Sequence, residues 1–406
     1  MRKATLAFIF ALVAMDVLAM GIVIPVYPKL VEQFMNGDTA RAAQVYGYMS
    51  TAWGVMQFVF MPLLGMLSDR FGRRPVILIS CFGLAVDYVV MALAPNVEWL
   101  FIGRVLSGIT AANMSTAFAY IADVTPQEKR AGAFGIMGAA FGVGFVAGPA
   151  LGGVLGGVDP RLPFWVAGVL ALLNAAYGFF VLPESLPPEK RAKFRWARAN
   201  PVGSLRLLRS HHELFGLSLV LFLMNLAHFS LPAVAVLYMG YRYGWGPVRV
   251  GLVLAGVGVF AMIVQGGLVR KVVPKIGERR ALAIGLLFGA IGFLMYGLAP
   301  TGLLFLAAIP VMSLWGFAMP SAQSIMTRHV SVSEQGQLQG ANASLMSIAG
   351  IFAPGLFTQT FAATLDRMPG AAFIVAAAML FLALAIAWRV TRGEPLTETG
   401  SRPTPG

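Results

Sequence analysis

The chain has 406 residues, of which 58% are hydrophobic and only 12% carry a charged side chain. Soluble domains are closer to a quarter charged, so the composition excludes an ordinary water-soluble protein. The formal net charge of +13 is compatible with nucleic-acid binding, but the placement of the basic residues argues against that partner. Cys81 is the one cysteine, which excludes an internal disulfide.

Twelve apolar stretches of about twenty residues follow one another along the chain. A helix of that length crosses a ~30 Å hydrocarbon layer and satisfies its own backbone groups there. The runs do not alternate polar and apolar residues, which argues against a barrel. The predicted spans are 5–27, 45–66, 75–95, 98–121, 131–155, 163–182, 213–238, 247–269, 279–299, 301–322, 336–360 and 370–391. The first run could pass for a signal peptide, but Asp16 lies in its middle and no small-residue cleavage site follows.

The basic residues are distributed unevenly between the two sides of these spans. On the side of the N-terminus lie 23 of the 30 lysines and arginines, six lie on the other side, and Arg104 falls within a span. This asymmetry is the positive-inside rule, and it predicts that both termini are cytoplasmic. The positive charge therefore orients the chain in the membrane, and nucleic acid is not an expected partner.

Matching features recur after about half the chain. Asp69-Arg-Phe-Gly-Arg73 closes the second span, and Lys275-Ile-Gly-Glu-Arg279 closes the eighth about 205 positions later. Thr125-Pro-Gln-Glu and Ser331-Val-Ser-Glu both fit the S/T-x-x-E capping box before a span. Together they predict an all-α membrane protein of two pseudo-symmetric six-helix bundles, the major facilitator fold. The predicted domains are a bundle at 1–182, a cytoplasmic central loop at 183–212, a bundle at 213–391 and a disordered cytoplasmic tail at 392–406.

Three charged residues lie inside predicted spans, where each costs at least ~2.5–3.5 kcal/mol. Asp16, Asp87 and Arg104 fall roughly 17, 18 and 20 Å from the cytoplasmic face, so all three fit one layer near the midplane. Two carboxylates with one guanidinium leave a surplus negative charge, which favours reversible proton binding to one carboxylate. We expect a proton-coupling site; the alternative is a fixed ion pair beside an aspartate that reaches a water cavity.

Asn225 and His228 lie three residues apart on one face of the seventh span. Both are candidates for substrate binding. A membrane-embedded histidine can also relay protons, and the alternative is a structural histidine with its hydrogen bonds satisfied.

Several motifs resemble a family of transporters. Gly65-Met-Leu-Ser-Asp69-Arg70-Phe-Gly72-Arg73-Arg74-Pro resembles the major-facilitator loop between helices two and three. Arg104-Val-Leu-Ser-Gly108 is similar to the fourth-helix motif of proton-coupled members. Gly144-x3-Gly148-Pro149-x2-Gly152-Gly153 is similar to the fifth-helix motif of antiporters. The likeness to the tetracycline-resistance efflux proteins spans nearly the whole chain.

The resemblance implies gating roles for these motifs. The loop residues would form a cytoplasmic latch that holds the outward-facing state closed on the inside, the alternative being a solvated orientation signal. Gly144, Gly148 and Gly152 lie four apart on one helix face, where they permit close approach of a second helix, and Pro149 kinks the span. Such a face packs helices whether or not it also shapes a gate. Gln57 resembles a substrate-facing glutamine of the family, or makes a plain interhelical hydrogen bond.

The chain departs from the tetracycline pumps in its second half. Ala261 and Gly289 occupy places where those pumps carry a histidine in helix eight and an aspartate in helix nine. The interior of the second-half spans has no acidic residue. This departure puts tetracycline itself in doubt and moves the coupling chemistry onto the first half.

The sequence therefore predicts proton-coupled efflux of a small amphipathic drug across the bacterial inner membrane. The expected partners are the drug, protons and membrane lipid. No metal or cofactor is expected, and the protein is expected to act as a monomer. The alternatives are a proton-coupled uptake symporter and an uncoupled transporter-like sensor. An enzyme is not expected, because no nucleophile–base set, metal cluster or nucleotide loop occurs in the sequence.

Overall fold

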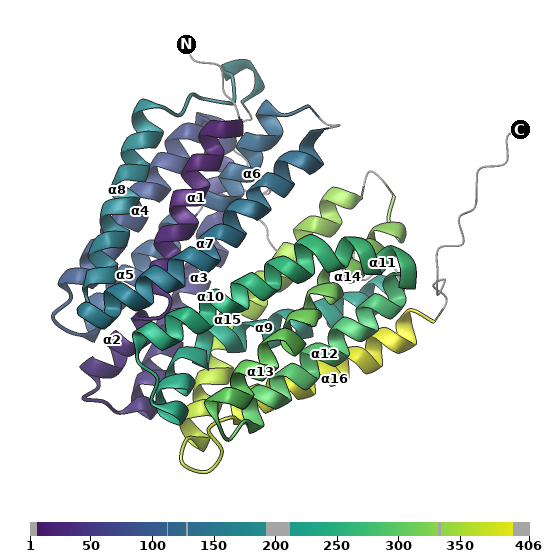
Figure 1. The fold of residues 1–406 in the computed structure, drawn as a ribbon. Coiled ribbons are helices and arrows are strands. Elements are labelled where there is room, and N and C mark those ends of the chain that lie inside the picture. The colour runs from purple at the N-terminus through teal and green to yellow at the C-terminus, as the bar shows by residue number, and fades with distance from the viewer. Residues whose placement is uncertain (1–5, 112, 127–128, 192–211, 332–333, 393–406) are drawn as a thin grey trace, which may run out of the picture. The chain divides into compact units, whose positions relative to one another are not determined.

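The computed structural model describes residues 6–111, 113–126, 129–191, 212–331 and 334–392. Within these ranges twelve helical stretches are long and apolar enough to cross a membrane, which confirms the predicted number. The first six spans are formed by α1 (Leu6–Val23) with α2 (Tyr27–Phe34), α3 (Thr39–Phe71), α4 (Arg73–Leu93), α5 (Val97–Thr110) with α6 (Asn113–Val124), α7 (Arg130–Val158) and α8 (Leu162–Phe180) (Figure 1). The last six are α9 (His212–Tyr243), α10 (Pro247–Met262) with α11 (Val269–Ile276), α12 (Glu278–Leu298), α13 (Gly302–Ser313) with α14 (Ala318–Arg328), α15 (Gln335–Thr364) and α16 (Ala371–Val390).

Four predicted spans are not continuous α-helices. In the first, a turn at residues 24–26 separates α1 from α2. The fourth breaks after Thr110, whose hydroxyl donates to the carbonyl of Leu106 and so competes with the helix ladder. A π-helical turn at Ile263–Leu268 joins α10 to α11, and a 3₁₀ turn at Leu314–Phe317 joins α13 to α14. A hydropathy pattern does not detect such interruptions, because they change the backbone hydrogen bonds and leave the polarity of the side chains unchanged.

The chain groups into two compact units. Unit one contains residues 1–200, 232–258 and 354–363, and unit two contains 201–231, 259–353 and 364–406. The predicted bundle boundaries at 1–182 and 213–391 stay a prediction. Residues 192–211 of the predicted central loop, and 393–406 of the predicted tail, lie outside the described residues. Of the two predicted capping boxes, Gln127 and Glu128 also lie outside them, whereas the amide of Ser331 donates to the Glu334 carboxylate at 3.0 Å.

Unit one is built around α1, which packs against α6, α7 and α8 (Figure 1). Glycines on α7 face α1 directly. A Cβ added at Gly148 would lie 2.6 Å from the Cα of Gly21, and one added at Gly144 would lie 2.6 Å from a methyl of Val17. A side chain therefore has no room at either position, and the two helices touch backbone to backbone.

In unit two, α12 packs against α13, α14 and α16. Its aromatic residues fill the space between these helices. The ring centroids of Tyr296 and Phe305 lie 4.4 Å apart, and those of Phe293 and Trp315 lie 5.6 Å apart. These contacts make α12 the central helix of this unit.

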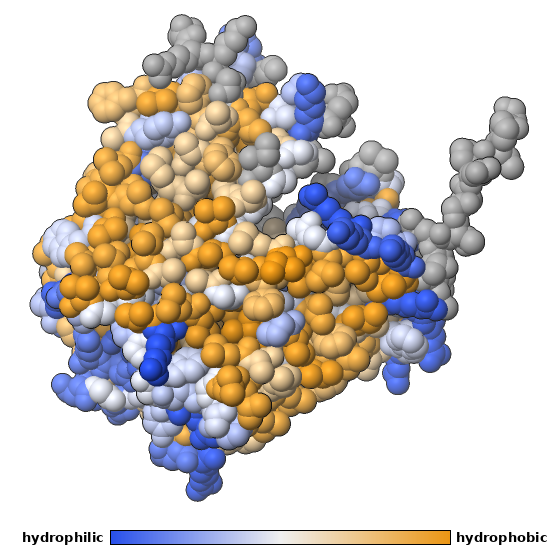
Figure 2. All heavy atoms as spheres, in the orientation of Figure 1, coloured by the Kyte–Doolittle hydropathy of each residue, from blue (hydrophilic) through white to orange (hydrophobic). Residues whose placement is uncertain are grey.

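Large apolar side chains remain exposed on the outer faces of the helices. On α8, Phe180 is 79% exposed and Leu173 is 58% exposed, and on α7 Val154 is 53% exposed. Figure 2 shows such side chains gathered over the bodies of the helices, with hydrophilic side chains toward the helix ends. A water-soluble protein avoids large apolar patches of this kind, so this surface is suited to lipid.

We predict that Gly148→Val destabilises the protein strongly, because the new side chain would collide with the α1 backbone. Overpacking of a close contact costs about 1–3 kcal/mol. The melting temperature of the purified protein in detergent measures the effect. Gly138→Val on the same helix is the matched control, since a Cβ at Gly138 meets nothing within 4 Å. Equal melting temperatures for the two variants would contradict the packing described here.

Candidate proton and gating sites

Asp87 and Arg104 form a buried ion pair between α4 and α5. Asp87 is fully buried, and its Oδ2 accepts from Nη2 of Arg104. The other oxygen, Oδ1, faces Gly103, where an added Cβ would lie 2.7 Å away, and it accepts no geometric hydrogen bond from the described residues. This arrangement neutralises the aspartate, and Ser107 lies within hydrogen-bonding reach of the same carboxylate.

Aromatic and soft groups complete the surroundings of Arg104. Its guanidinium carbon lies 5.1 Å from the ring centroid of Tyr27, a cation–π geometry. Tyr27 packs edge-on against Tyr46, and its hydroxyl donates to the sulfur of Met49. Arg104 Nε is buried without a hydrogen-bond partner among the described residues. The guanidinium is therefore held by one carboxylate, one ring and the sulfur of Met91, which accepts from Nη2 at 4.0 Å.

Asp16 has a different kind of partner. It is 6% exposed, and its Oδ1 accepts from the amide nitrogen of Asn174 on α8 at 3.2 Å. The same amide nitrogen donates to the carbonyl of Leu12 at 2.9 Å, which fixes its orientation. Tyr88, next to Asp87 in the chain, lies within electrostatic reach of both carboxylates. The structure thus pairs one aspartate with a guanidinium and the other with a neutral amide.

The loop motif forms a polar cluster with the end of α6. Arg73 donates to Asp69 one turn earlier, and its Nε donates to Asp123 Oδ2 at 3.0 Å. The hydroxyl of Ser185 donates to the same Asp123 oxygen at 3.0 Å. We call Asp69, Arg73 and Asp123 the loop cluster. Because Asp69 and Asp123 both bind Arg73, the cluster ties the end of α3 to the end of α6.

The turn between α3 and α4 is shaped by Gly72 and Glu184. Gly72 has φ +110°, a region that only glycine enters freely, and a Cβ there would collide with the Glu184 carboxylate. That carboxylate accepts from the amides of Arg73 at 2.8 Å and Arg74 at 3.2 Å, and so caps the start of α4. Arg74 also donates to the carbonyl of Phe179 and lies over its ring.

Unit two repeats this turn with its charges reversed. Gly277 has φ +80° and begins α12 as Gly72 begins α4. Arg328, at the end of α14, binds Glu278, which follows the glycine. Glu278 and Arg328 each lie 205 positions after Arg73 and Asp123, so the same two positions carry an ion pair of opposite sense.

The remaining gating candidates differ in their surroundings. Gly152 faces the carbonyl of Ile22 on α1, and Pro149 lies inside α7 as predicted from its position. An added Cβ at Gly65 meets nothing within 4 Å. Arg70 is exposed, with its guanidinium 5.1 Å from the Phe71 ring centroid.

The substrate-binding candidates are also unequal. Asn225 is buried, and its amide donates to the carbonyl of Leu221 on the same helix at 2.9 Å. His228 is exposed and lies 5.7 Å from Trp315, measured between ring centroids. Gln57 is partly exposed on α3. His228 and Gln57 are therefore accessible, whereas Asn225 is buried and its side-chain amide is bound to a backbone carbonyl of its own helix.

Gly289, where the tetracycline pumps carry an aspartate, is closely packed in the structure. A Cβ added at Gly289 would lie 2.8 Å from Cγ of Trp315 and 2.9 Å from a methyl of Leu380. The indole thus occupies the space in which a side chain at position 289 would begin. Ala261 is partly exposed on α10.

Sequence reasoning missed several polar partners. Asn174, Glu184 and Asp123 are not among the site residues that the sequence predicts. Asn174 carries a usable signal, since it is an amide within an apolar span. Glu184 lies outside the predicted spans, where acidic residues are common and do not indicate a site.

Comparison with known proteins identifies relatives along the whole chain. Residues 9–354, and again 275–406, match the Major Facilitator Superfamily. The chain is 37% identical to tetracycline resistance protein, class C, of Escherichia coli over 93% of this chain and 95% of that protein. It is 29% identical to multidrug resistance protein 2 of Bacillus subtilis (strain 168) over 84% of each chain. A solved D-xylose–proton symporter is 19% identical and superposes with a TM-score of 0.75, covering 96% of this chain and 99% of that one.

We predict that Gly72→Ala lowers the melting temperature, because alanine is strained at φ +110° and its Cβ displaces the carboxylate that caps α4. A strained backbone of this kind costs of order 1–3 kcal/mol. Gly65→Ala in the same motif is the control, with free space around it. Loss of stability in Gly65→Ala but not in Gly72→Ala would contradict this account.

We also predict that Arg104→Gln is more damaging to stability than the double variant Asp87→Asn with Arg104→Gln. Removing one partner leaves a buried charge uncompensated, at a cost of about 3–5 kcal/mol, and the double variant removes both charges. Thermal unfolding in detergent separates the variants. A double variant no more stable than the single one would show that the pair contributes more than neutralisation.

Proposed function

Because the chain belongs to the major facilitator superfamily and, within it, to the tetracycline resistance protein family, we propose that it exports a small amphipathic drug in exchange for protons. These relatives are transporters and not enzymes. The substrate class is tetracycline-like or multidrug, because the relatives include proteins named for each kind of resistance. Transport proceeds by alternating access.

The observation that carries the proposal is the set of charges in unit one. Asp87 is neutralised by Arg104, whereas Asp16 faces the neutral amide of Asn174. In a low-dielectric site, two carboxylates with one guanidinium favour the uptake of one proton. Either carboxylate can accept that proton, so each is replaced in the test below. Either way, proton binding changes the net charge of the site and so its preference for one gate state.

The proton gradient is strong enough for this task. One proton that crosses ~100 mV supplies about 2.3 kcal/mol. Since ~1.4 kcal/mol is tenfold in an equilibrium, this supports roughly a 45-fold drug gradient.

The gate residues fit alternating access. The loop cluster joins the ends of α3 and α6 by an ion pair at the rim of the membrane, where it can open without burying a charge. The glycine face of α7 contacts α1, the helix that carries Asp16, so a shift of α7 acts directly on that helix. We propose that the loop cluster is the cytoplasmic latch and that Gly144, Gly148, Pro149 and Gly152 shape the moving contact.

Substrate contacts fall to accessible polar and aromatic groups. In unit two, His228 beside Trp315 offers stacking and hydrogen bonding without negative charge. In unit one, Gln57 offers a separate polar group. Trp315 fills the space beside Gly289, so the drug is recognised by rings where the tetracycline pumps use an aspartate. We propose that the second half contributes aromatic contacts and the first half the proton.

The proposed orientation follows from the charge distribution, and the location and the monomeric state are further parts of the proposal. Both termini are cytoplasmic by the positive-inside asymmetry, the protein lies in the bacterial inner membrane, and it works as a monomer of two six-helix bundles. Proton-coupled uptake is the second candidate, and the fold alone leaves it open because a D-xylose–proton symporter superposes on this chain. The antiporter-type glycine motif favours efflux. An uncoupled sensor would need neither aspartate.

The test uses inverted membrane vesicles energised to an acidic interior. Addition of the transported drug from a panel of tetracyclines, cationic dyes and phenicols should partly collapse the pH gradient. Asp16→Asn and Asp87→Asn should each reduce that collapse at least about tenfold, because a neutral amide binds no proton in this range. Asp38→Asn is the matched control, since Asp38 is exposed and an asparagine still caps α3.

The outcomes separate the candidates. Collapse with particular drugs that survives Asp38→Asn but not the other variants supports drug–proton exchange and names the substrate. Drug accumulation without proton movement in well-inserted protein would overturn coupling. Absence of both drug and proton movement would favour metabolite uptake or a sensor.

A further inference from the structure

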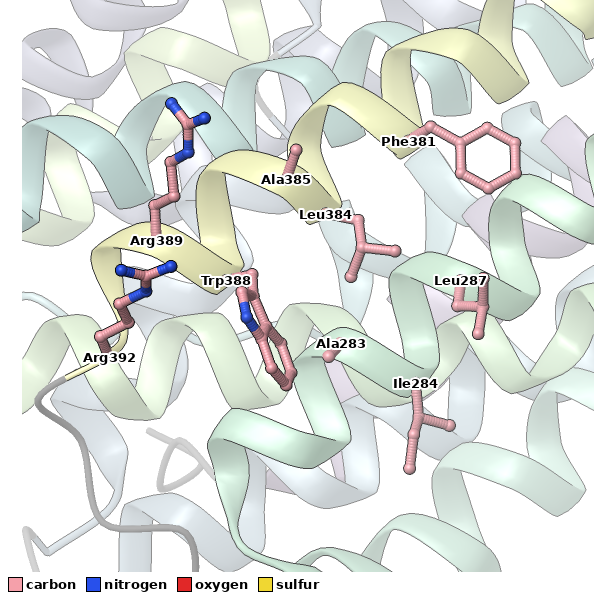
Figure 3. Close-up of a pocket in the computed structure, with 9 residues that line it drawn as sticks. All are labelled: Ala283, Ile284, Leu287, Phe381, Leu384, Ala385, Trp388, Arg389 and Arg392. Atoms are coloured by element: carbon pink, nitrogen blue, oxygen red, sulfur yellow. The ribbon is translucent and has the colours of Figure 1, made fainter.

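A hollow of about 530 Å³ opens between α12 and α16 in unit two, away from the residues assigned above. Phe381, Leu384 and Trp388 line it from α16, and Ala283 and Leu287 line it from α12 (Figure 3). Phe381 and Trp388 remain 39% and 51% exposed. The hollow is therefore a groove on the outer surface of this unit.

The helix geometry explains the length of the groove. Residues 381, 384, 385 and 388 follow the spacing of one helix face, so their side chains form a continuous wall along α16. Ala283 and Ala385 are short, so they leave room between the two helices. The walls are apolar over about two turns of helix. That shape suits an extended hydrocarbon chain.

The other end of the groove is basic. Arg389 and Arg392 line it where α16 ends (Figure 3). Arg279 lies at the start of α12, and its guanidinium carbon is 5.0 Å from the ring centroid of Trp388. Arg279 Nε is buried without a hydrogen-bond partner in the part of the chain that the structure describes. No described carboxylate lies within 4 Å of any of these three guanidinium groups. A positive cluster with unmet hydrogen-bonding capacity remains.

We propose that this groove binds an anionic phospholipid of the bilayer. One acyl chain lies along Phe381, Leu384 and Trp388, and the phosphate lies between Arg389, Arg392 and Arg279. The helix ends fix the depth: α12 begins and α16 ends at the same membrane surface, so the arginines lie at headgroup level and the apolar wall at chain level.

Charge and shape together select this occupant. A soluble anion would use the arginines and leave the apolar wall empty, and a zwitterionic lipid would fill the wall without matching the charge. A second copy of the chain would have to present a carboxylate against the basic end. An anionic lipid satisfies both halves of the groove at once.

The experiment places the full-length protein in nanodiscs of phosphatidylcholine that contain a small share of dibrominated lipid. Bromine quenches tryptophan only at close range, and subtraction of the Trp388→Phe signal isolates Trp388 from the other six tryptophans. Dibrominated phosphatidylglycerol should quench Trp388 more than dibrominated phosphatidylcholine at the same mole fraction. Each arginine at a membrane surface contributes about 1 kcal/mol toward an anionic lipid, which is roughly a five-fold preference.

Arg389→Gln with Arg392→Gln should remove most of that preference. Arg270→Gln with Lys271→Gln is the matched control, because it removes the same charge from exposed positions on α11 outside the groove. Ala385→Phe supplies a second, charge-neutral variant that fills the groove and should lower quenching by either lipid.

Four outcomes would overturn the proposal. They are equal quenching by both lipids, a preference that survives the double arginine variant, an equal loss in the control variant, and a Trp388 shielded from both lipids by a second copy of the chain.

Discussion

The structure depends on the absence of water around its charged groups. In hydrocarbon no water is available to solvate a carboxylate, so a buried charge is stable only when it is paired with another group of the chain. Asp87 meets this constraint with Arg104 and a nearby aromatic ring, and Asp16 meets it with the amide of Asn174. The helix contacts α4–α5 and α1–α8 are thus fixed by polar pairs as well as by packing. The site proposed to bind the proton is therefore also a site that fixes these helix contacts.

The backbone contact between α1 and α7 complements the polar pairs. Gly148 meets Gly21 with no side chain between the helices, so the two backbones are in direct contact at this point. On the other side of α1 the amide of Asn174 binds both a backbone carbonyl and Asp16. One face of α1 therefore makes a direct backbone contact, and another face makes polar contacts.

Much of the fold could be predicted from the sequence, because the thickness of the bilayer sets the length of each apolar span. Apolar length predicted the twelve spans, and basic asymmetry predicted an orientation. Helix interruptions such as Ile263–Leu268 could not be predicted, since they depend on backbone bonding that apolar side chains do not encode. Three site residues could be predicted because a charged side chain within an apolar span is costly: Asp16, Asp87 and Arg104. Their partners were harder, because Asn174 and Glu184 act through geometry that only the packed helices create.

The reversed ion pairs at the two repeated turns have a consequence for how the chain assembles. Arg73 binds Asp123 in one unit, and Glu278 binds Arg328 in the other. If the turn of one unit met the helix end of the other, Arg73 would face Arg328 and Glu278 would face Asp123. Both wrong combinations place like charges together, and like charges repel. Each turn is therefore matched in charge to the helix end of its own unit and mismatched to the corresponding helix end of the other.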